Sequence, residues 1–273
     1  MAATKATFRV PFLVITSLTA LAGCGGGGGG GIQRAGSGDE VGRTYYIDGA
    51  GNWGFGVSEI KAGLQASGYR GHVVNYRWSP TFNPALDQTV GRPVAKLKGR
   101  ELGRQITAYL QKYPQNEVNI IALSAGTGVA VWSCEAVEPP AKVHSLVMLG
   151  SSLSASYDMS EALANISGGV WVYHSPNDQI LLGPVATLGT IDGKIGSAPA
   201  GLVGLRASSP LIHNVPWRPA YERYGWTGAH TDATSTPFVK AYLSKHVVST
   251  TAAAEATAGT ASSAELASGG QPR

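Results

Sequence analysis

Cysteine and charge are both scarce in this sequence. Its 273 residues include two cysteines, Cys24 and Cys134, which is too few for a disulfide framework or for a zinc site with four cysteine ligands. Charged residues make up 14% of the chain and hydrophobic residues 43%, a balance that excludes an intrinsically disordered protein. The hydrophobic residues are too interrupted for a bundle of membrane-spanning helices. The composition therefore indicates one globular domain of about 200 residues, large enough to bury a full core.

A clear excess of either charge is also lacking. Lysine and arginine number 21 and aspartate and glutamate 17, a net charge of +4. Two of the basic residues, Lys5 and Arg9, lie in an N-terminal segment that we expect to be removed, which leaves 19 basic and 17 acidic residues. A near-neutral protein gives no compositional sign of the basic face that nucleic-acid binding requires. We therefore expect no nucleic-acid partner.

The N-terminal segment carries the pattern of an export signal. Lys5 and Arg9 give it a positive start, and the apolar stretch 10–20 is well short of the about 20 residues that span a bilayer as a helix. It ends in Leu-Ala-Gly-Cys24, which resembles the lipobox of bacterial lipoproteins. We predict that the signal peptide 1–23 is cleaved and that lipid on Cys24 anchors the protein at the bacterial cell envelope, on the periplasmic or extracellular face. An ordinary cleaved signal with a chance cysteine is the alternative.

Low-complexity segments flank the predicted fold. Residues 24–43 contain a run of seven glycines and are expected to form a flexible tether. Residues 249–273 are rich in Ala, Ser, Thr and Gly, with no aromatic residue and no repeating apolar face, and are expected to be a disordered tail. The folded domain is therefore predicted to span residues 44–248.

Strand and helix patterns alternate through this domain. Short apolar runs, typical of strands, lie at 44–47, 72–76, 118–123, 143–149, 170–173 and, more weakly, 211–217. Apolar residues at helical spacing lie at 57–64, 102–110, 125–135 and 236–242. Thr236 is expected to be the N-cap of the last helix. This order predicts an α/β fold with a mostly parallel central sheet flanked by helices.

Two connecting segments bear on how open a site at the sheet edge would be. Residues 183–210 are rich in glycine and have little periodicity, so we expect a long loop there. The segment between the strands 143–149 and 170–173 has room for little more than one small helix. We therefore expect little or no cap over the sheet edge and an open site.

The junction between the strand 118–123 and the helix 125–135 places Ser124 at a tight turn. A serine at such a turn has a strained backbone, and its hydroxyl projects beyond the sheet edge. This crowding requires small residues two before and two after the serine, and Ala122 and Gly126 meet the requirement. The N-terminus of the following helix would also stabilise a developing oxyanion. Ser124 is therefore the candidate nucleophile, and an ordinary turn that happens to use serine is the alternative.

A serine nucleophile needs a histidine that takes its proton and a carboxylate that orients the histidine. Among six histidines, His230 is the one that lies in a loop between the last strand and the last helix. Asp178 comes just after the strand 170–173, and Asp158, which follows the preceding strand, is the reserve candidate for the acid. Since Ser-Pro-Asn-Asp is also good turn chemistry, a purely structural Asp178 is the alternative.

The succession Ser124, Asp178, His230, each at its own strand end, resembles the α/β-hydrolase superfamily over about residues 45–248. The resemblance implies that Ser124 is the nucleophile, Asp178 the orienting acid and His230 the general base. It implies a serine hydrolase that cleaves small-molecule or lipid esters of carboxylic acids through an acyl-enzyme, without a metal or an organic cofactor.

The same resemblance implies an oxyanion hole. One backbone N–H would come from Ala125, directly after the nucleophile, and a second from Ala50 or Gly51 in the glycine-rich loop after the first strand. The sequence departs from the family pattern in having Ala122 where glycine is commoner, and in lacking a His-Gly-Gly-Gly form of the oxyanion loop. These departures concern the subfamily and the substrate.

Two other classes of function fit parts of the sequence. The segment 49–54 matches the G-x-G-x-x-G turn of dinucleotide-binding oxidoreductases, although residues 72–79 contain no acid to bind a ribose hydroxyl. A non-catalytic binding lipoprotein that keeps a hydrolase scaffold is the second alternative.

Overall fold

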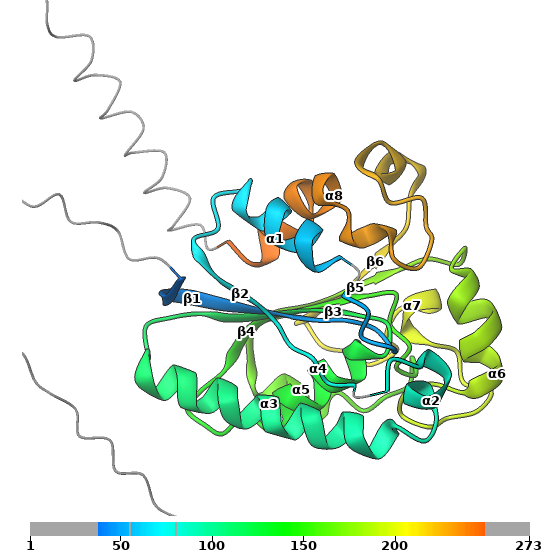
Figure 1. Cartoon of the computed structure of the whole chain (residues 1–273), viewed down its shortest axis with the longest axis horizontal. Helices are drawn as coiled ribbons and strands as arrows, with labels where there is room; N and C mark the ends of the chain where they lie inside the picture. The colour runs from blue at the N-terminus through cyan, green and yellow to red at the C-terminus, as the bar shows by residue number, and fades with distance from the viewer. Residues whose placement is uncertain (1–37, 55, 80, 249–273) are drawn as a thin grey trace, which may run out of the picture. The chain divides into compact units, whose positions relative to one another are not determined.

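Six parallel strands form one sheet at the centre of the computed structural model, which describes residues 38–54, 56–79 and 81–248 (Figure 1). The strand order is β2-β1-β3-β4-β5-β6, and every neighbouring pair is parallel. The strands are β1 (Gly38–Ile47), β2 (Gly71–Asn75), β3 (Val118–Leu123), β4 (Val143–Leu149), β5 (Ile166–His174) and β6 (Ile212–Pro216). The predicted α/β class with a parallel sheet is confirmed.

Helices connect the strands and cover the sheet. They are α1 (Val57–Gln65), α2 (Pro84–Gln88), α3 (Arg92–Lys112), α4 (Gly126–Glu135), α5 (Ser160–Ala164), α6 (Ala186–Leu188), α7 (Ala200–Val203) and α8 (Thr236–Ala241). Shorter turns are the π-helical η1 (Leu181–Val185) and the 3-10 helical η2 (Pro219–Tyr224), η3 (Asp232–Thr234) and η4 (Leu243–His246). No helix in these described ranges is long and apolar enough to cross a membrane.

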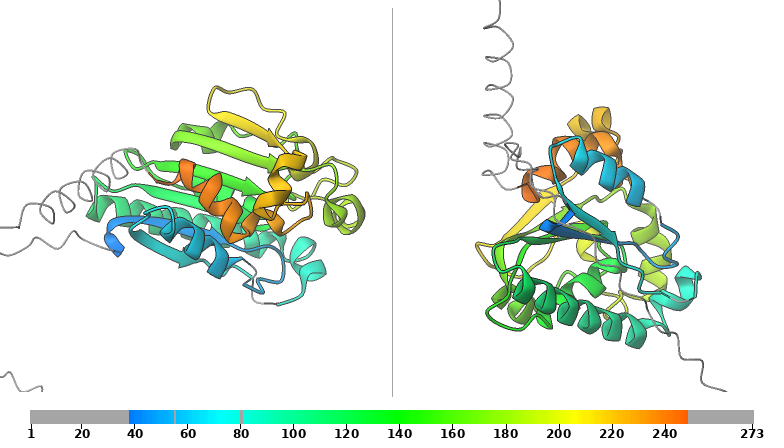
Figure 2. Two further views of the ribbon diagram at one scale, coloured as in Figure 1. Left: turned by 90° about the horizontal axis from the view of Figure 1, so that it is seen from above. Right: turned by 60° about the vertical axis from the view of Figure 1, so that its left-hand side comes forward.

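Alternate residues of each strand pack into different hydrophobic cores, because successive side chains of a strand point to opposite faces of the sheet. On β3, Ile120 and Ala122 belong to the core under α3 and α4. Ile121 and Leu123 belong to the core under α1 and α8. All six residues of β3 are buried, as expected for a strand covered on both faces. The sheet lies between these two helical layers in Figure 1 and in the right-hand view of Figure 2.

Small residues allow the helix α3 to pack closely against α4. A Cβ atom on Gly99 would lie 2.7 Å from the Cβ of Trp132, and one on Gly103 would lie 2.6 Å from the backbone oxygen of Ser133. Residues 99 and 103 are one turn apart and share a helix face. The helix ends at Lys112, two residues before Pro114, which could not continue it.

Three predicted boundaries differ from the structure. The predicted tether ends too late, because β1 begins at Gly38 and pairs with β2 from that residue. The prediction of a long loop over 183–210 is wrong, since the end of η1 and the whole of α6 and α7 lie within this segment. The last helix has Ser235 as its N-cap, one residue before the predicted Thr236. The signal peptide, Cys24 and the tail 249–273 lie outside the described residues, and the statements about them stay predictions.

Candidate active site

The site lies where the connections of the sheet change direction. After β1 the chain moves outward to β2, and after β2 it returns across β1 to β3, so the ends of β1 and β3 are neighbours. Ile47, the last residue of β1, is paired with Ala122, the residue before the last of β3. The loops that leave two such strands diverge to opposite faces and leave a crevice at the carboxyl edge of the sheet, where ligands of parallel α/β proteins bind.

Ser124 follows β3 directly and has a left-handed backbone conformation, with a φ angle of 53°. This conformation is uncommon for residues other than glycine and is typical of strained functional turns. Hydrogen bonds hold it: the Ser124 N–H donates to the oxygen of Leu149 (2.9 Å), and the oxygen of Ser124 accepts the N–H groups of Thr127 (3.1 Å) and Ser152 (3.3 Å) and the hydroxyl of Thr127. Ala125 is the N-cap of α4, so the predicted strand–turn–helix arrangement at this serine is present.

Neighbouring glycines make room for this turn. A Cβ on Gly126 would lie 2.4 Å from the backbone oxygen of Asp48, and one on Gly49 would lie 3.0 Å from the Cβ of Ser124. The requirement for a small residue at 126 therefore has a physical cause, the contact between the start of α4 and the end of β1.

His230 and Asp178 form a hydrogen-bonded pair. The Nδ1 of His230 lies 2.7 Å from the Oδ2 of Asp178. Asp178 is 2% exposed, and its Oδ1 accepts the backbone N–H groups of Ile180 and Leu181, each at 3.1 Å. These bonds fix the carboxylate just past the end of β5, and the pairing leaves the Nε2 of His230 free to act toward a substrate or a nucleophile.

The reserve candidate, Asp158, lies elsewhere. It is fully exposed, and its Oδ1 accepts the hydroxyl and the N–H of Ser160 at 2.6 and 3.0 Å. These hydrogen bonds lower the pKa of Asp158. The structure therefore brings His230 together with Asp178 and not with Asp158.

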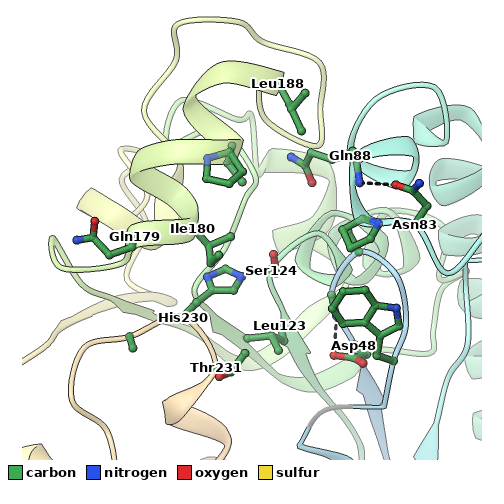
Figure 3. A pocket seen from close by; sticks show the side chains of 18 residues that line it. Asp48, Asn83, Gln88, Leu123, Ser124, Gln179, Ile180, Leu188, His230 and Thr231 are labelled. Atoms are coloured by element: carbon green, nitrogen blue, oxygen red, sulfur yellow. Dashed lines mark hydrogen bonds between the residues drawn. The ribbon is translucent and has the colours of Figure 1, made fainter.

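Ser124 and His230 line the same pocket, which has a volume of about 700 Å³ (Figure 3). Its size is within the range of cavities that bind small organic ligands. The walls are mainly apolar, with a few polar groups near Ser124. The lining residues are Asp48, Gly49, Ala50, Trp53, Asn83, Pro84, Ala85, Gln88, Leu123, Ser124, Gln179, Ile180, Pro184, Val185, Leu188, Ala229, His230 and Thr231.

The structure separates the two candidates for the second oxyanion donor. Gly51 donates its N–H to the Oδ2 of Asp87 over 2.7 Å and does not line the pocket. Ala50 does line it. Within the described residues, the N–H groups of Ala50 and Ala125 have no acceptor in the chain. Of the residues expected to form an oxyanion hole, Ala50 and Ala125 are therefore the ones available.

Two buried carboxylates that sequence reasoning missed hold the loop after β1. Asp48 accepts the N–H of Gly49 at 2.8 Å and that of Gly54 at 2.6 Å. Asp87, in α2, accepts the N–H of Gly51 and, at 2.6 Å, the hydroxyl of Thr81. Asp48 stands in an Asp-Gly turn, where an acid is expected for local reasons. No sequence signal links Asp87 to a loop 36 residues away.

Two short elements form much of the pocket wall. Asn83, Pro84, Ala85 and Gln88 come from α2 and its N-cap, and the opposite side comes from residues 179–188 (Figure 3). The segment 149–170 is fully described and forms one short α-helix, α5, as expected. The cover of the site therefore comes from the segment after β5, which the sequence indicated as a loop, and not from the segment after β4.

The hydrogen bonds of the loop 48–54 argue against dinucleotide binding. In such a turn the backbone N–H groups and the helix N-terminus must face a pyrophosphate. Here the N–H groups of Gly49, Gly51 and Gly54 are bound to Asp48 and Asp87. These two buried carboxylates would repel a phosphate group. Within the described part of the chain, no group of three or more His, Cys, Asp or Glu side chains is placed to hold a metal ion.

Comparison with known proteins finds likeness in structure only. No family model and no curated protein matches the chain. It is similar to the ydeN gene product of B. subtilis, with 15% identity and a TM-score of 0.44 over 76% of this chain and 99% of that one. It is also similar to the RedJ thioesterase of the prodiginine pathway in Streptomyces coelicolor, with 12% identity and a TM-score of 0.39 over 80% and 96% of the two chains.

A third similar structure is the mouse alpha/beta hydrolase domain-containing protein 10, with 12% identity and a TM-score of 0.36 over 75% of this chain and 85% of that one. The likeness to these three structures concerns the fold alone.

Proposed function

We propose that the protein is a serine hydrolase that cleaves carboxylic esters through an acyl-enzyme. One observation carries this proposal: a serine in a left-handed turn at the end of β3 shares a pocket with a histidine whose other ring nitrogen is bound to a buried carboxylate. Nucleophile, base and orienting acid come from three separate segments of the chain. A structural role for each of them alone would not require that they meet at one pocket.

The proposed reaction begins with attack of the Ser124 Oγ on the substrate carbonyl while the Nε2 of His230 takes the hydroxyl proton. Asp178 stabilises the imidazolium that forms. The N–H groups of Ala125 and Ala50 bind the negative oxygen of the tetrahedral intermediate. When the intermediate collapses, the C–O bond to the alcohol breaks, and His230 gives its proton to the leaving oxygen. A water molecule, deprotonated by His230, then cleaves the acyl-serine ester and regenerates the free hydroxyl.

The pocket supports an apolar ester as substrate. Its walls carry side chains such as Leu123, Ile180, Val185 and Leu188, and burial of each substrate methylene group there would contribute about 0.8 kcal/mol. A non-catalytic binding protein on the same scaffold would use this pocket without the pair His230–Asp178. The two functions differ in one property, the reactivity of the Ser124 hydroxyl.

A fluorophosphonate probe tests this property, because it forms a covalent bond with an activated serine. We expect the wild-type protein to be labelled on Ser124 and to hydrolyse short p-nitrophenyl esters. Ser124→Ala should abolish labelling and lower kcat by several orders of magnitude. Ser152→Ala, a buried serine next to the same turn, is the matched control and should still be labelled. A wild-type protein that binds an ester in the pocket but is not labelled by the probe would instead support the function of a non-catalytic binding protein.

We also propose that lipid on Cys24 anchors the enzyme at the bacterial cell envelope. The support is the segment Leu-Ala-Gly-Cys24 after a short apolar stretch. Cys24→Ser should move the protein from the membrane fraction to the supernatant, and its retention in the membrane fraction would contradict the anchor.

A further inference from the structure

The charge of the protein is concentrated on one helix. The helix α3 carries six basic residues and a single acidic residue, a net charge of +5, whereas the whole chain has a net charge of +4. The composition of the whole chain is near neutral, but the helix α3 is strongly basic. The basic residues are Arg92, Lys96, Lys98, Arg100, Arg104 and Lys112.

Three of these cations form an exposed row. Lys96, Arg100 and Arg104 are four residues apart, which places them on one side of the helix, and all three are exposed. Among the described residues, no carboxylate lies within ion-pair distance of any of them. Lys98 differs, because it pairs with Glu101 at 2.7 Å. We call Lys96, Arg100 and Arg104 the basic row.

One carboxylate of the neighbouring helix α4 lies near the row. Glu135 is partly buried and accepts the hydroxyl of Tyr157 at 2.7 Å. Burial raises the pKa of Glu135, and the charges of Lys96 and Arg100 lower it in part. Glu135 accepts its hydrogen bond from Tyr157 and forms no ion pair with the basic row. The exposed cations of the row therefore keep their positive charge unpaired within the ranges that the structure describes.

Exposed apolar side chains run beside the basic row. Val94 and Leu97 lie one helical turn apart on α3 and are 38% and 58% exposed, and Val90, in the turn just before α3, is 74% exposed. Leu86, on α2, and Phe82, just before it, continue this apolar edge toward the pocket mouth. Phe82 has a φ angle of 55°, an unusual conformation for a bulky residue, and its oxygen accepts the indole N–H of Trp53. We call these five residues the apolar edge.

The apolar edge is connected to the pocket. Arg92, at the start of α3, donates to the backbone oxygen of Leu188 at 2.9 Å, and Gln88 of α2 donates to that of Gly189 at 3.0 Å. Leu188 and Gln88 both line the pocket. In Figure 1, α2 lies beside the N-terminal end of α3 and near α6. A partner bound along the edge would therefore lie next to the entrance to Ser124.

We propose that the basic row and the apolar edge together bind the surface of an anionic lipid bilayer. A helix with cations beside exposed apolar residues matches the two layers of such a surface, anionic headgroups and the start of the acyl chains. A nucleic acid would use the cations but has no use for the valine and leucine side chains of the edge. The predicted lipid on Cys24 would keep the domain within reach of a membrane, because Gly38, where β1 begins, is only 14 residues further along the chain.

Vesicle flotation tests the proposal on the full chain with Cys24→Ser, which cannot be lipidated. The probe is a vesicle of phosphatidylcholine with about 30% phosphatidylglycerol, compared with phosphatidylcholine alone. Lys96→Gln/Arg100→Gln/Arg104→Gln should weaken binding to the anionic vesicles about 100-fold, the equivalent of roughly 1 kcal/mol per cation. The matched control removes three exposed cations elsewhere, Lys61→Gln/Arg206→Gln/Arg218→Gln, and should change binding less than about 3-fold.

The apolar part is tested separately on the same background. Val94→Ser/Leu97→Ser should weaken vesicle binding about 10-fold, whereas Ile195→Ser/Val203→Ser, at other exposed apolar positions, should not. Single substitutions in the basic row should each weaken binding about 5-fold, so the result does not depend on the fold of the triple variant. Equal binding by the two triple variants would overturn the proposal. So would an apolar variant that binds vesicles like wild type while a DNA duplex binds the basic row.

Discussion

At the residue scale, the site depends on a few backbone conformations that neighbouring side chains enforce. Ser124 is held at a positive φ angle by hydrogen bonds to Leu149 and Ser152. The loop opposite is held by Asp48 and Asp87, which bind three of its N–H groups. Bonds of this kind to a charged acceptor are stronger than those between neutral groups. The backbone of Ser124 and the loop that carries the N–H of Ala50 are therefore held in place by the protein itself.

Asp178→Asn and Asp158→Asn distinguish the two candidate acids. Asparagine keeps the shape of the side chain but removes the charge that stabilises the imidazolium of His230. We expect Asp178→Asn to lower kcat for a p-nitrophenyl ester by a factor on the order of 1,000 to 10,000. Asp158→Asn should leave it unchanged, since Asp158 is exposed and bound only to Ser160. The opposite result would transfer the acid role to Asp158.

Asp87 is expected to act as a positioning residue. Asp87→Ala removes the acceptor for the Gly51 N–H and frees the peptide that directly follows the proposed donor residue Ala50. We expect kcat to fall about 10- to 100-fold with KM little changed, because an oxyanion hole acts in the transition state. Asp87→Asn retains an oxygen acceptor and should recover part of kcat. A matching loss in kcat and thermal stability, without recovery by Asn, would indicate a structural role only.

Local patterns revealed the triad candidates, and distant contacts remained hidden. Ser124 and Asp178 each follow a buried apolar strand, and parallel strands bring their ends to one edge. The sequence alone therefore predicts that Ser124 and Asp178 lie at the same edge of the sheet. Asp87 acts on a residue 36 positions away through a turn that no pattern describes. For the same reason, the sequence left Ala50 and Gly51 as alternatives, since the bond of Gly51 to Asp87 and the place of Ala50 in the pocket wall separate them.

At the scale of elements, the helices on each face of the sheet pack against one another through close contacts at small residues. On α1, Gly63 lies against α8, where an added Cβ would be 2.5 Å from the Cβ of Val239. The elements that form the pocket walls are shorter, and η1 contains Pro184. Its residues lack the regular apolar spacing of a long helix, so the sequence indicated a loop there. Long periodic segments such as α3 were evident because their buried residues recur at each turn.

Gly63→Ala tests the contact between α1 and α8. Alanine is favoured over glycine inside a helix by about 1 kcal/mol, so the same substitution at a helix position with free space around it would stabilise the protein. At Gly63 the contact with Val239 should dominate and lower the free energy of unfolding by about 1–3 kcal/mol. Urea denaturation measures the change, with Gly183→Ala as control, because a Cβ there would meet no atom within 4 Å. Stabilisation by Gly63→Ala would show that the two helices separate easily.

At the scale of the whole molecule, stability should depend on a partly buried histidine near the C-terminal end of the described chain. His246 stacks on Trp171, with ring centroids 4.2 Å apart, and its Nε2 lies 2.9 Å from the hydroxyl of Tyr173. His213 stacks on Trp171 as well. Burial, followed by the charges of His213 and Lys245, lowers the pKa of His246 to about 4. The folded protein therefore holds this imidazole in its neutral form at neutral pH.

The lowered pKa predicts a loss of stability in mild acid. In the unfolded chain His246 has its ordinary pKa of 6.5, so below pH 6.5 the unfolded state binds the proton first. The free energy of unfolding should fall from pH 6.5 to about pH 4 and then level off, by at most about 3 kcal/mol from this group. His246→Phe keeps a ring against Trp171 but cannot titrate. Its denaturation midpoint should vary less over this range, and an unchanged pH dependence would assign the effect to other groups.

The pocket is built by the strand ends and by two segments outside the sheet, and this division has a consequence for how the proposed hydrolase could change. A Cβ on Gly126 would overlap the backbone oxygens of Ile47 and Asp48, and one on Gly49 would press on the Cβ of Ser124. Residues 83–88 and 179–188 lie outside the sheet, and they include both pocket-lining side chains and groups that hold the site, namely Asp87 and the N–H groups of Ile180 and Leu181. Substitution of the lining side chains of Pro84, Ala85, Val185 and Leu188 should therefore alter which esters the proposed hydrolase accepts while Asp87 and Asp178 keep their contacts, so diversification of this scaffold would proceed from its periphery.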